Sequence, residues 1–248
     1  IIKKNLHYAT FAETEEDVET EESNPSDKSY TSFENQYYPP YVESEGNIKN
    51  DCCLSENLII TGPNASGKTT YLKTTILNVI FTQQFGVGFY KKCVLKPYSH
   101  IHSYLNIPDT SGRDSLFQAE SRRCKEIIDQ INTSGKDERH FCIFDELYSG
   151  TNPVEATKSA YSFLAYLSKF KNVDFLLTTH YTSICDKLDD SPTIKNMKMD
   201  TVHDEGSDEI TYNYTISEGI SKIQGAILVL KAMDYPEEII QEINDFED

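Results

Sequence analysis

The chain has 248 residues and a mass of 28.3 kDa, enough for one domain of ordinary size with a full hydrophobic core. Its formal net charge of −17 argues against a protein that wraps DNA over its whole surface. The sequence contains no apolar run of about eighteen residues and no apolar core of a secretion signal near its start, so it predicts no membrane span and no membrane partner. It begins with Ile1 rather than Met, as an excerpt of a longer protein would.

The acidic excess is concentrated near the N-terminus. Between Phe11 and Glu45, eleven acidic residues accompany one basic residue, a balance of −10 that leaves −7 for the rest of the chain. Residues 11–36 therefore predict a disordered acidic arm, because a segment so charged and so poor in apolar residues cannot build a core. We expect residues 1–36 to be an N-terminal segment and residues 37–248 to form one domain. The arm is interpreted as a solvated linker; the alternative is a tail that binds a basic partner or mimics nucleic acid.

A phosphate-binding loop is the strongest local signal in the chain. The run GPNASGKT at residues 62–69 fits the pattern GxxxxGK[ST] and lies between the apolar run Leu58–Ile60 and a helical pattern. Its glycines permit backbone conformations in which successive N–H groups wrap a phosphate chain at a helix N-terminus. Its lysine adds a charge near the β- and γ-phosphates, and its threonine hydroxyl can ligate Mg²⁺. The predicted nucleotide-binding residues are Gly62, Pro63, Asn64, Ala65, Ser66, Gly67, Lys68, Thr69 and Thr70.

An amphipathic helix is expected after this loop, with Leu72, Ile76, Val79 and Ile80 on its core-facing side. A buried strand, a glycine-rich loop and a helix in this order are typical of the start of a parallel α/β domain. The sequence therefore predicts an α/β fold.

Two short strands are expected next, at residues 93–95 and 101–104. His100 and His102 accompany the second strand. We interpret both as polar positions on that strand, with metal ligation as the alternative, because no cysteine or carboxylate cluster lies beside them in the sequence.

A helix is expected from Ser115 to about Gly135, after a polar loop at residues 109–114. The hydroxyl of Ser115 and the free N–H groups at the helix start form a natural anion site. The alternative interpretation is that Ser115 only caps the helix.

Two carboxylates follow the apolar run Phe141–Phe144. In a nucleotide-binding α/β domain such a strand ends at the phosphate side of the sheet, where Asp145 reaches the Mg²⁺ shell and Glu146 can orient water for attack on the γ-phosphate. This pattern is weak alone and strong after a phosphate loop. A helix is expected next over residues 154–170, with Pro153 in its first turn.

A histidine ends the strand expected at residues 173–180. Ligands of doubly wound sheets bind at the carboxyl ends of the strands, so we expect His180 on the same edge as Asp145 and Glu146. There it can contact the γ-phosphate; the alternative is a structural histidine.

The C-terminal part predicts an antiparallel strand pair and two short helices. The expected strands are residues 194–199 and 210–216, joined by an acidic turn at 203–208, and the expected helices are residues 223–232 and 237–246.

Six cysteines form no CxxC pair and have no histidine at a spacing typical of zinc sites. We expect free thiols in a reducing intracellular compartment, the cytoplasm or nucleus, with a viral origin left open. A redox role for Cys52 and Cys53 is the disfavoured alternative, because adjacent cysteines are poorly placed to bridge each other.

These motifs together resemble the C-terminal ATPase domain of the MutS family of DNA mismatch-repair proteins. GPNASGKTTYLK is similar to the family's phosphate loop, SLFQAE (115–120) to its serine-led signature helix, FDELYSGTNP (144–153) to its Walker B segment, TTHY (178–181) to its switch histidine, and residues 214–243 to its closing strand and helices. The motifs occur in the family's order and cover nearly everything from about residue 37 onward. The resemblance implies a P-loop NTPase fold of the ABC-type ATPase kind, with a mainly parallel sheet flanked by helices and an antiparallel β portion.

The resemblance also implies a Mg²⁺-dependent, DNA-dependent ATPase. It implies a homodimer or heterodimer through this domain, whose composite site couples ATP hydrolysis to a clamp that holds double-stranded DNA through other parts of the protein. The alternatives are a MutS-like ATPase of recombination or genome maintenance without mismatch recognition, and a nucleotide-gated dimerisation module. The implied roles are catalysis by Glu146, His180, Lys68 and Asn64, Mg²⁺ binding by Thr69 and Asp145, adenine contact by Ile48 and by Tyr212 or Tyr214, and γ-phosphate contact by Ser115 of a second subunit.

The sequence departs from the repair MutS pattern at two places. Ala65-Ser66 replaces the more usual Met-Gly or Gly-Gly, and residues 147–152 differ from the usual Ile-Gly-Arg-Gly-Thr-Ser. This variant resembles divergent, MutS-like branches of the family. Mismatch-recognition, clamp and lever segments are not in this chain. A transporter-type or chromosome-structure ATPase is disfavoured because no LSGGQ-like signature is present, and an idle dimerisation module would not need both Lys68 and Glu146.

Overall fold

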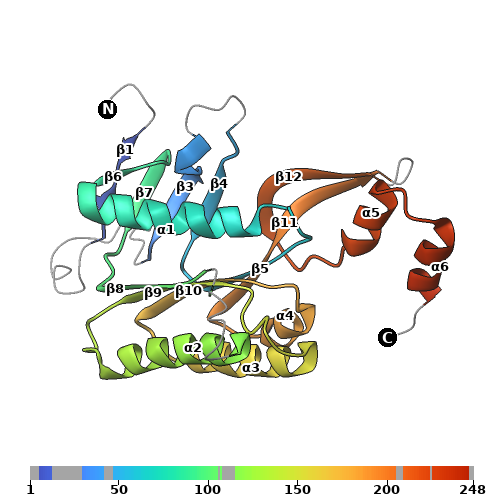
Figure 1. The fold of residues 1–248 in the computed structure, drawn as a ribbon. Coiled ribbons are helices and arrows are strands. Elements are labelled where there is room, and N and C mark those ends of the chain that lie inside the picture. Colours follow the sequence, from blue (N-terminus) through green and yellow to red (C-terminus); the bar gives the residue numbers. More distant parts are fainter. Residues whose placement is uncertain are drawn as a thin grey trace.

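The structure, a computed structural model, describes residues 6–12, 30–41, 47–105, 107, 115–204, 209–223 and 225–245. Its centre is a six-stranded sheet in the order β12-β11-β5-β10-β9-β8 (Figure 1). The strands are β5 (Asn57–Thr61), β8 (His100–Tyr104), β9 (His140–Asp145), β10 (Val173–Thr178), β11 (Ile194–Asp204) and β12 (Glu209–Glu218). All neighbouring pairs are parallel except β11 and β12, which are antiparallel. The predicted α/β class with a mainly parallel sheet and an antiparallel portion is confirmed.

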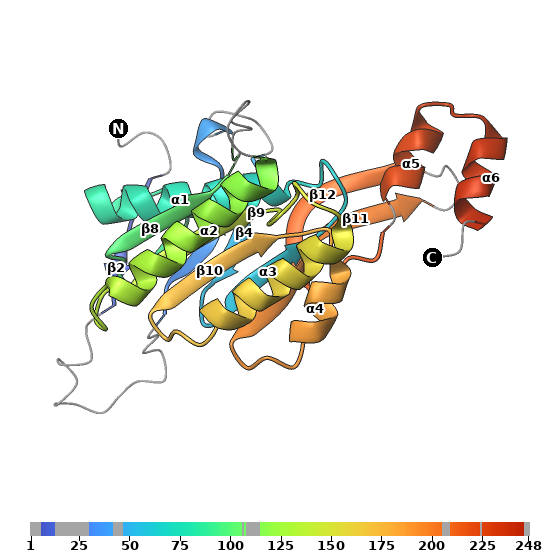
Figure 2. The same ribbon diagram turned by 60° about the horizontal axis from the view of Figure 1, so that its bottom comes forward.

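Helices cover both faces of this sheet (Figures 1 and 2). One face carries α2 (Leu116–Thr133), α3 (Pro153–Leu167) and α4 (Thr182–Leu188). The other carries α1 (Lys68–Phe85) and a second sheet in the order β2-β7-β3-β4. Its strands are β2 (Thr10–Phe11), β3 (Ser32–Gln36), β4 (Asn50–Cys53) and β7 (Lys92–Leu95).

The remaining elements are peripheral. β1 (His7–Tyr8) pairs with β6 (Val87–Gly88), and a 3-10 turn, η2, spans Pro39–Tyr41. After the β11–β12 pair come α5 (Gly225–Ala232), which lies beside β12, and α6 (Glu237–Asp245), which lies beyond α5 (Figure 1). Of these elements and those above, α4, β3, β4, η2 and the two-residue strands have no counterpart among the predicted ones.

Alternating side chains of the central strands enter two separate hydrophobic cores. Ile59 packs with α2, α3 and α4, whereas its neighbours Leu58 and Ile60 pack with α1 and the second sheet. β9 divides in the same way, with Phe144 on one side and Ile143 on the other. Strands buried on both faces read as continuous apolar runs, which is why their positions are predictable from sequence.

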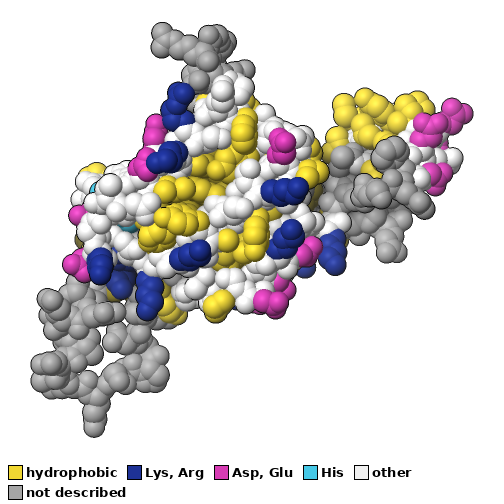
Figure 3. All heavy atoms as spheres, turned by 90° about the horizontal axis from the view of Figure 1, so that it is seen from below, with side chains coloured by type: hydrophobic (Ala, Val, Ile, Leu, Met, Phe, Trp, Pro, Cys, Tyr) yellow, Lys and Arg dark blue, Asp and Glu magenta, His cyan; other side chains and the backbone are white. Residues whose placement is uncertain are grey.

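The face formed by α2 and α3 is not uniformly acidic. Figure 3 shows apolar patches on this side of the molecule with Lys and Arg side chains among them. The net charge of −17 is therefore unevenly distributed over the chain. No helix in the described residues is long and apolar enough to cross a membrane.

The helix α1 is less amphipathic than predicted because it is packed between two sheets. Leu72, Ile76 and Val79 are buried as expected, but Ile80 is 38% exposed, so its assignment to the core-facing side is wrong. Polar side chains fill the buried positions instead. Asn78, for example, accepts a 2.7 Å hydrogen bond from the backbone N–H of Phe89.

The predicted limits of the acidic arm are too wide. β2 pairs with β7, and β3 lies between β7 and β4 with Phe33 only 2% exposed, so residues 32–36 belong to the second sheet. The alternation of Phe33 with polar residues provides one buried face despite the acidic surroundings. The acidic residues at 13–29 lie outside the described residues, and the disorder predicted for them is therefore untested.

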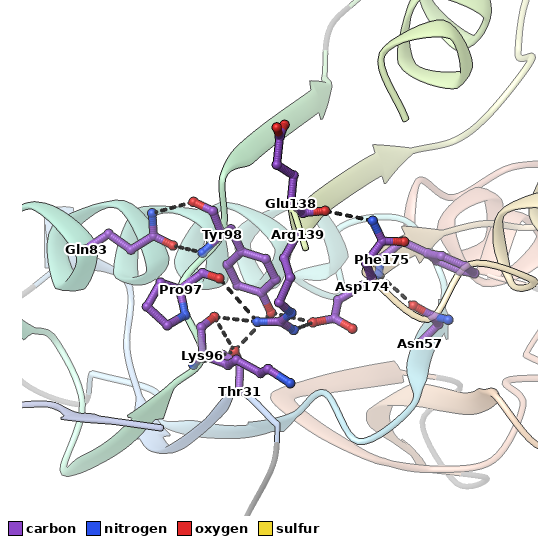
Figure 4. A network of polar contacts seen from close by, with 11 residues as sticks. Thr31, Asn57, Gln83, Lys96, Pro97, Tyr98, Glu138, Arg139, Asp174 and Phe175 are labelled. Carbon is purple, nitrogen blue, oxygen red and sulfur yellow. Dashed lines mark hydrogen bonds and ion pairs between the residues drawn. The ribbon is translucent and has the colours of Figure 1, made fainter. Parts of the chain in front are cut away.

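A partly buried ion pair connects the start of the central strands to the segment that leaves the second sheet (Figure 4). The Arg139 guanidinium donates to the Asp174 carboxylate at 2.5 Å and to the Lys96 carbonyl at 2.6 Å, and it stacks over the Tyr98 ring. The Tyr98 hydroxyl donates to Asp174 at 2.7 Å. Burial raises the pKa of the Asp174 carboxyl, although Arg139 and Tyr98 act to lower it. Both charges are thus satisfied where the two layers meet.

Three histidines stack at the edge formed by β8 and β9. His102 Nε2 lies 3.0 Å from His140 Nδ1, and His100 Nε2 lies 2.6 Å from the Glu138 carboxylate. The described residues contain no group of three or more His, Cys, Asp or Glu that could hold a metal ion. His100 and His102 both lie in β8, the strand expected there. All six cysteines are free and only Cys53 is exposed, while the compartment remains a prediction.

The buried histidines should make stability fall in mild acid. Burial, followed by the neighbouring His140, Arg123 and His100, lowers the pKa of His102 from 6.5 to about 4. Between these pH values the unfolded chain binds a proton that the folded chain does not, so the free energy of unfolding should decrease as the pH falls from 6.5 towards 4, by up to roughly 3 kcal/mol. Urea unfolding at a series of pH values measures this slope.

His102→Gln should remove this part of the pH slope, whereas His7→Gln, at an exposed position of β1, should leave it intact. An unchanged slope in His102→Gln would show that His102 titrates alike in both states.

Candidate functional site

The carboxyl ends of three adjacent strands bring the predicted site residues to one edge of the central sheet. β10 lies between β5 and β9, and Thr178 is paired with Ile60 on one side and with Asp145 on the other. The phosphate loop follows β5, Glu146 follows β9, and His180 follows β10. The expectation that His180 shares an edge with Asp145 and Glu146 is confirmed. We call this region the carboxyl edge.

The phosphate loop is built around left-handed backbone conformations. Gly67 has φ 99° at the start of α1 and Ala65 has φ 62°. Glycine is favoured at the first of these positions because a side chain is disfavoured there, and an added Cβ would also lie 3.2 Å from the Tyr214 ring. Lys68 folds back across the loop, and its ammonium donates to the carbonyls of Gly62 at 2.9 Å and Pro63 at 3.1 Å.

Lys68 lies in a largely buried position beside the acidic residues. Burial lowers the pKa of its ammonium, while the carboxylates of Glu146 and Asp145 act in the opposite direction. An ammonium with little water around it interacts strongly with added negative charge. The position therefore suits a phosphate group.

A cavity of about 580 Å³ opens above this loop and continues towards a group of aromatic side chains. Most of the predicted nucleotide-binding residues line this cavity. Ser66 supports the fit of a phosphate ligand, because its hydroxyl oxygen is buried and has no hydrogen-bond partner among the residues that the structure describes. The lining residues are Gln36, Tyr37, Tyr38, Tyr41, Asn47, Ile48, Asn50, Asn64, Ala65, Ser66, Gly67, Lys68, Thr69, Thr70, Tyr71, Thr74, Glu146 and Tyr214.

The two predicted metal ligands touch each other. The Thr69 hydroxyl donates to both oxygens of the Asp145 carboxylate, at 3.1 and 2.9 Å, and the Thr178 hydroxyl donates to the same carboxylate at 2.5 Å. Hydroxyl and carboxylate oxygens are the ligands that Mg²⁺ prefers, and it usually takes few of them from the protein beside waters and phosphate oxygens. Thr69 and Asp145 therefore fit a Mg²⁺ ion held together with a phosphate.

Glu146 and His180 are in hydrogen-bond contact at the carboxyl edge. His180 Nε2 lies 2.9 Å from a Glu146 carboxylate oxygen and 3.3 Å from the Lys68 ammonium. The hydrogen bond from His180 lowers the pKa of the Glu146 carboxyl, with Lys68 acting in the same direction and burial opposing it. Glu146 is thus ionised at neutral pH, as a general base must be.

Glu146 also has a constrained backbone. Its φ is 55°, and that of Tyr148 is 59°. Non-glycine residues in this region are held there by their surroundings, and such residues are common at functional sites.

Only some of the residues predicted to contact adenine lie at the cavity. Ile48 and Tyr214 both line the cavity, whereas Tyr212 does not. Tyr38 and Tyr41 also line it, although the sequence analysis assigned them no role. Only the antiparallel packing of β3 and β4 brings these tyrosines to the phosphate loop, so local sequence pattern contains no signal for them.

Ser115 is the predicted site residue that lies apart from the others. It does not line the cavity. It caps α2, because its hydroxyl accepts from the Gln118 backbone N–H and its own N–H donates to the Gln118 side chain. The capping role is confirmed, and any contact with phosphate would need a second subunit.

Fold and site together define an α/β protein with a glycine-containing loop before α1, a hydroxyl–carboxylate pair and a Glu–His pair along one edge of a mainly parallel sheet. The sequence profile of MutS domain V matches residues 58–248. The chain therefore belongs to the MutS family, whose members are ATPases that bind ATP.

Relatives of the chain include several DNA mismatch-repair proteins. It is 28% identical over 224 residues to spellchecker 1 of Drosophila melanogaster, covering 87% of this chain and 23% of that protein. It is 35% identical over 155 residues to MSH3 of Candida albicans, covering 60% and 14%. It is 26% identical over 223 residues to MutS of Staphylococcus haemolyticus, covering 87% and 24%. The chain thus spans less than a quarter of the length of these relatives.

Proposed function

We propose that this chain is the ATP-binding and ATP-hydrolysing domain of a MutS-like protein that acts on double-stranded DNA. The observation that carries the proposal is the arrangement at the carboxyl edge, where Lys68, Thr69 and Glu146 line one cavity. Asp145 and His180 lie in direct contact with these three residues. The domain predicted for residues 37–248 also includes β3, because this strand belongs to the second sheet. The deviating residues 65–66 and 147–152 support a divergent branch of the family.

Each polar group at this edge suits one part of phosphoryl transfer. ATP and Mg²⁺, when bound, supply the transferable phosphoryl group and its charge neutralisation. The loop N–H groups, Ser66 and Lys68 would hold the phosphates, and Thr69 and Asp145 would hold the metal ion. We assign Glu146 as the base that accepts a proton from the attacking water. We assign His180 as the group that orients this water. Asn64, which lines the cavity, would position the water or a phosphate oxygen.

Ile48 and Tyr214, which both line the cavity, are proposed to contact the adenine base. Tyr214 has φ 57°, and Asn50 fixes its strand by donating to the Tyr214 carbonyl at 2.9 Å and accepting from the Ile216 N–H at 2.9 Å. An aromatic ring held in this way offers a rigid stacking surface.

We further propose that two such domains associate, as a homodimer or heterodimer, and that the site is completed by Ser115 of the second subunit. The C-terminal helices support association, because α5 and α6 expose a group of large apolar side chains. These are Val229, Met233, Tyr235, Ile239 and Ile243. Hydrolysis would then be coupled to a DNA clamp formed outside this chain.

ATP turnover and the mass in solution test the function together. The chain should hydrolyse ATP only when Mg²⁺ is present, and its mass should shift towards a dimer when ATP is added. Addition of double-stranded DNA to the same assay tests whether the rate depends on DNA. A chain that binds no nucleotide at millimolar ATP would contradict the proposal, and Lys68→Ala provides the matched inactive control.

A further inference from the structure

Glu120 is a buried carboxylate that has no role in the function proposed above. It lies in α2, is 2% exposed, and accepts three hydrogen bonds from the loop that follows β9. The backbone N–H and the hydroxyl of Ser149 donate to its Oε1 at 3.0 and 2.9 Å, and the Gly150 N–H donates to its Oε2 at 3.1 Å. Hydrogen bonds at a buried acceptor are costly to break, because the freed groups would lose their partners away from water, so this contact anchors the loop firmly.

The anchored loop is the one that carries Glu146. Glu146 and Tyr148 both have left-handed backbones, which persist only where neighbouring groups enforce them. The Tyr148 N–H donates to the Tyr104 hydroxyl at 3.2 Å. Gly150 lies so close to α2 that an added Cβ would approach the Leu116 Cγ to 2.7 Å. The loop is therefore held directly against the first turns of α2.

We propose that Glu120 is a positioning residue for ATP hydrolysis, which holds residues 149–150 so that Glu146 keeps the backbone conformation in which it meets His180. The inference rests on the proposed function. Glu120 does not line the nucleotide cavity, so it acts through Glu146 rather than on the ligand. Ser115 caps the start of α2, the helix end proposed to face a second subunit. The hydrogen bonds of Glu120 therefore connect this helix to the loop that carries Glu146.

Glu120→Gln tests this role because it keeps the size of the side chain and exchanges one acceptor oxygen for an amide donor. We expect kcat for ATP to fall by about 10²-fold, the loss typical of a catalytic group displaced by about 1 Å, and KM to stay within about twofold. Glu126→Gln is the matched control on the same helix, at a side chain that is 56% exposed, and should leave both constants unchanged. All assays are run well below the melting temperature of each variant.

The double variant Glu120→Gln/Glu146→Gln separates positioning from general destabilisation. It should turn over no more slowly than Glu146→Gln alone, because both changes act on the same group. A second, independent loss in the double variant overturns the inference, as does wild-type kcat in Glu120→Gln.

Hydrogen exchange distinguishes this inference from the proposed function. If the unmodified chain hydrolyses no ATP, the proposed function fails. The anchoring is then judged by the amides of residues 149–150, which should exchange faster in Glu120→Gln than in Glu126→Gln. Equal exchange in the two variants overturns the inference.

Discussion

Glu146→Gln should bind ATP normally and hydrolyse it at least 10²-fold more slowly, the contribution typical of a positioned general base. The amide has the same shape as the carboxylate and can still contact His180, so the cavity and its phosphate contacts stay in place. It cannot take a proton from water, since it has lost the charge that His180 and Lys68 stabilise. Single-turnover hydrolysis and the affinity for a fluorescent ATP analogue measure the two quantities separately.

A matched control for Glu146→Gln is Glu242→Gln, an exposed carboxylate of α6. It should leave both turnover and affinity unchanged. Normal hydrolysis by Glu146→Gln would assign the base to another group, and loss of ATP binding would instead show that the Glu146 charge supports the Lys68 position.

The site residues were predictable from the sequence because they lie at or shortly after the ends of buried strands. Asp145 is the last residue of β9, Glu146 follows it, and His180 comes two residues after the end of β10. Parallel strands place their carboxyl ends along one edge. Asp145, Glu146 and His180 are therefore brought together by topology alone. Their contacts with Lys68 and Thr69 then require only that the helix after β5 begins at the same edge.

The parts that local sequence could not predict depend on packing between distant segments. The second sheet brings Tyr38 and Tyr41 to the cavity and covers α1, which is why polar Asn78 is buried and apolar Ile80 is exposed. In the same way, β3 could not be predicted from its charged composition, because its buried face depends on pairing with β4 and β7. The anchoring of residues 149–150 by Glu120 joins two segments that are separate in sequence, and no local pattern marks it.

Ser115→Arg should bind ATP in its own phosphate loop and fail to hydrolyse it. Ser115 lies outside the cavity of its own chain, so a cation there leaves the local nucleotide contacts intact. In the proposed dimer it would face the γ-phosphate of the other subunit, where a bulky, misplaced side chain keeps the two domains apart. Loss of the cap alone should cost about 1 kcal/mol of stability and little turnover. Gln118→Ala, which breaks the same capping box without adding a charge, measures that smaller effect.

Mixing two inactive chains tests directly whether the site is shared. Ser115→Arg retains Lys68, and Lys68→Ala retains Ser115, so a heterodimer of the two contains one site with an intact loop from one chain and an intact Ser115 from the other. If subunits pair at random in a symmetric dimer, an equal mixture should recover about a quarter of the unmodified activity, since half of the dimers carry one of two sites. The recovered rate should rise with total protein concentration as dimers form. Because neither chain alone can supply the missing group, recovery requires that Ser115 act across the interface, whereas a mixture as inactive as its components would confine Ser115 to capping α2.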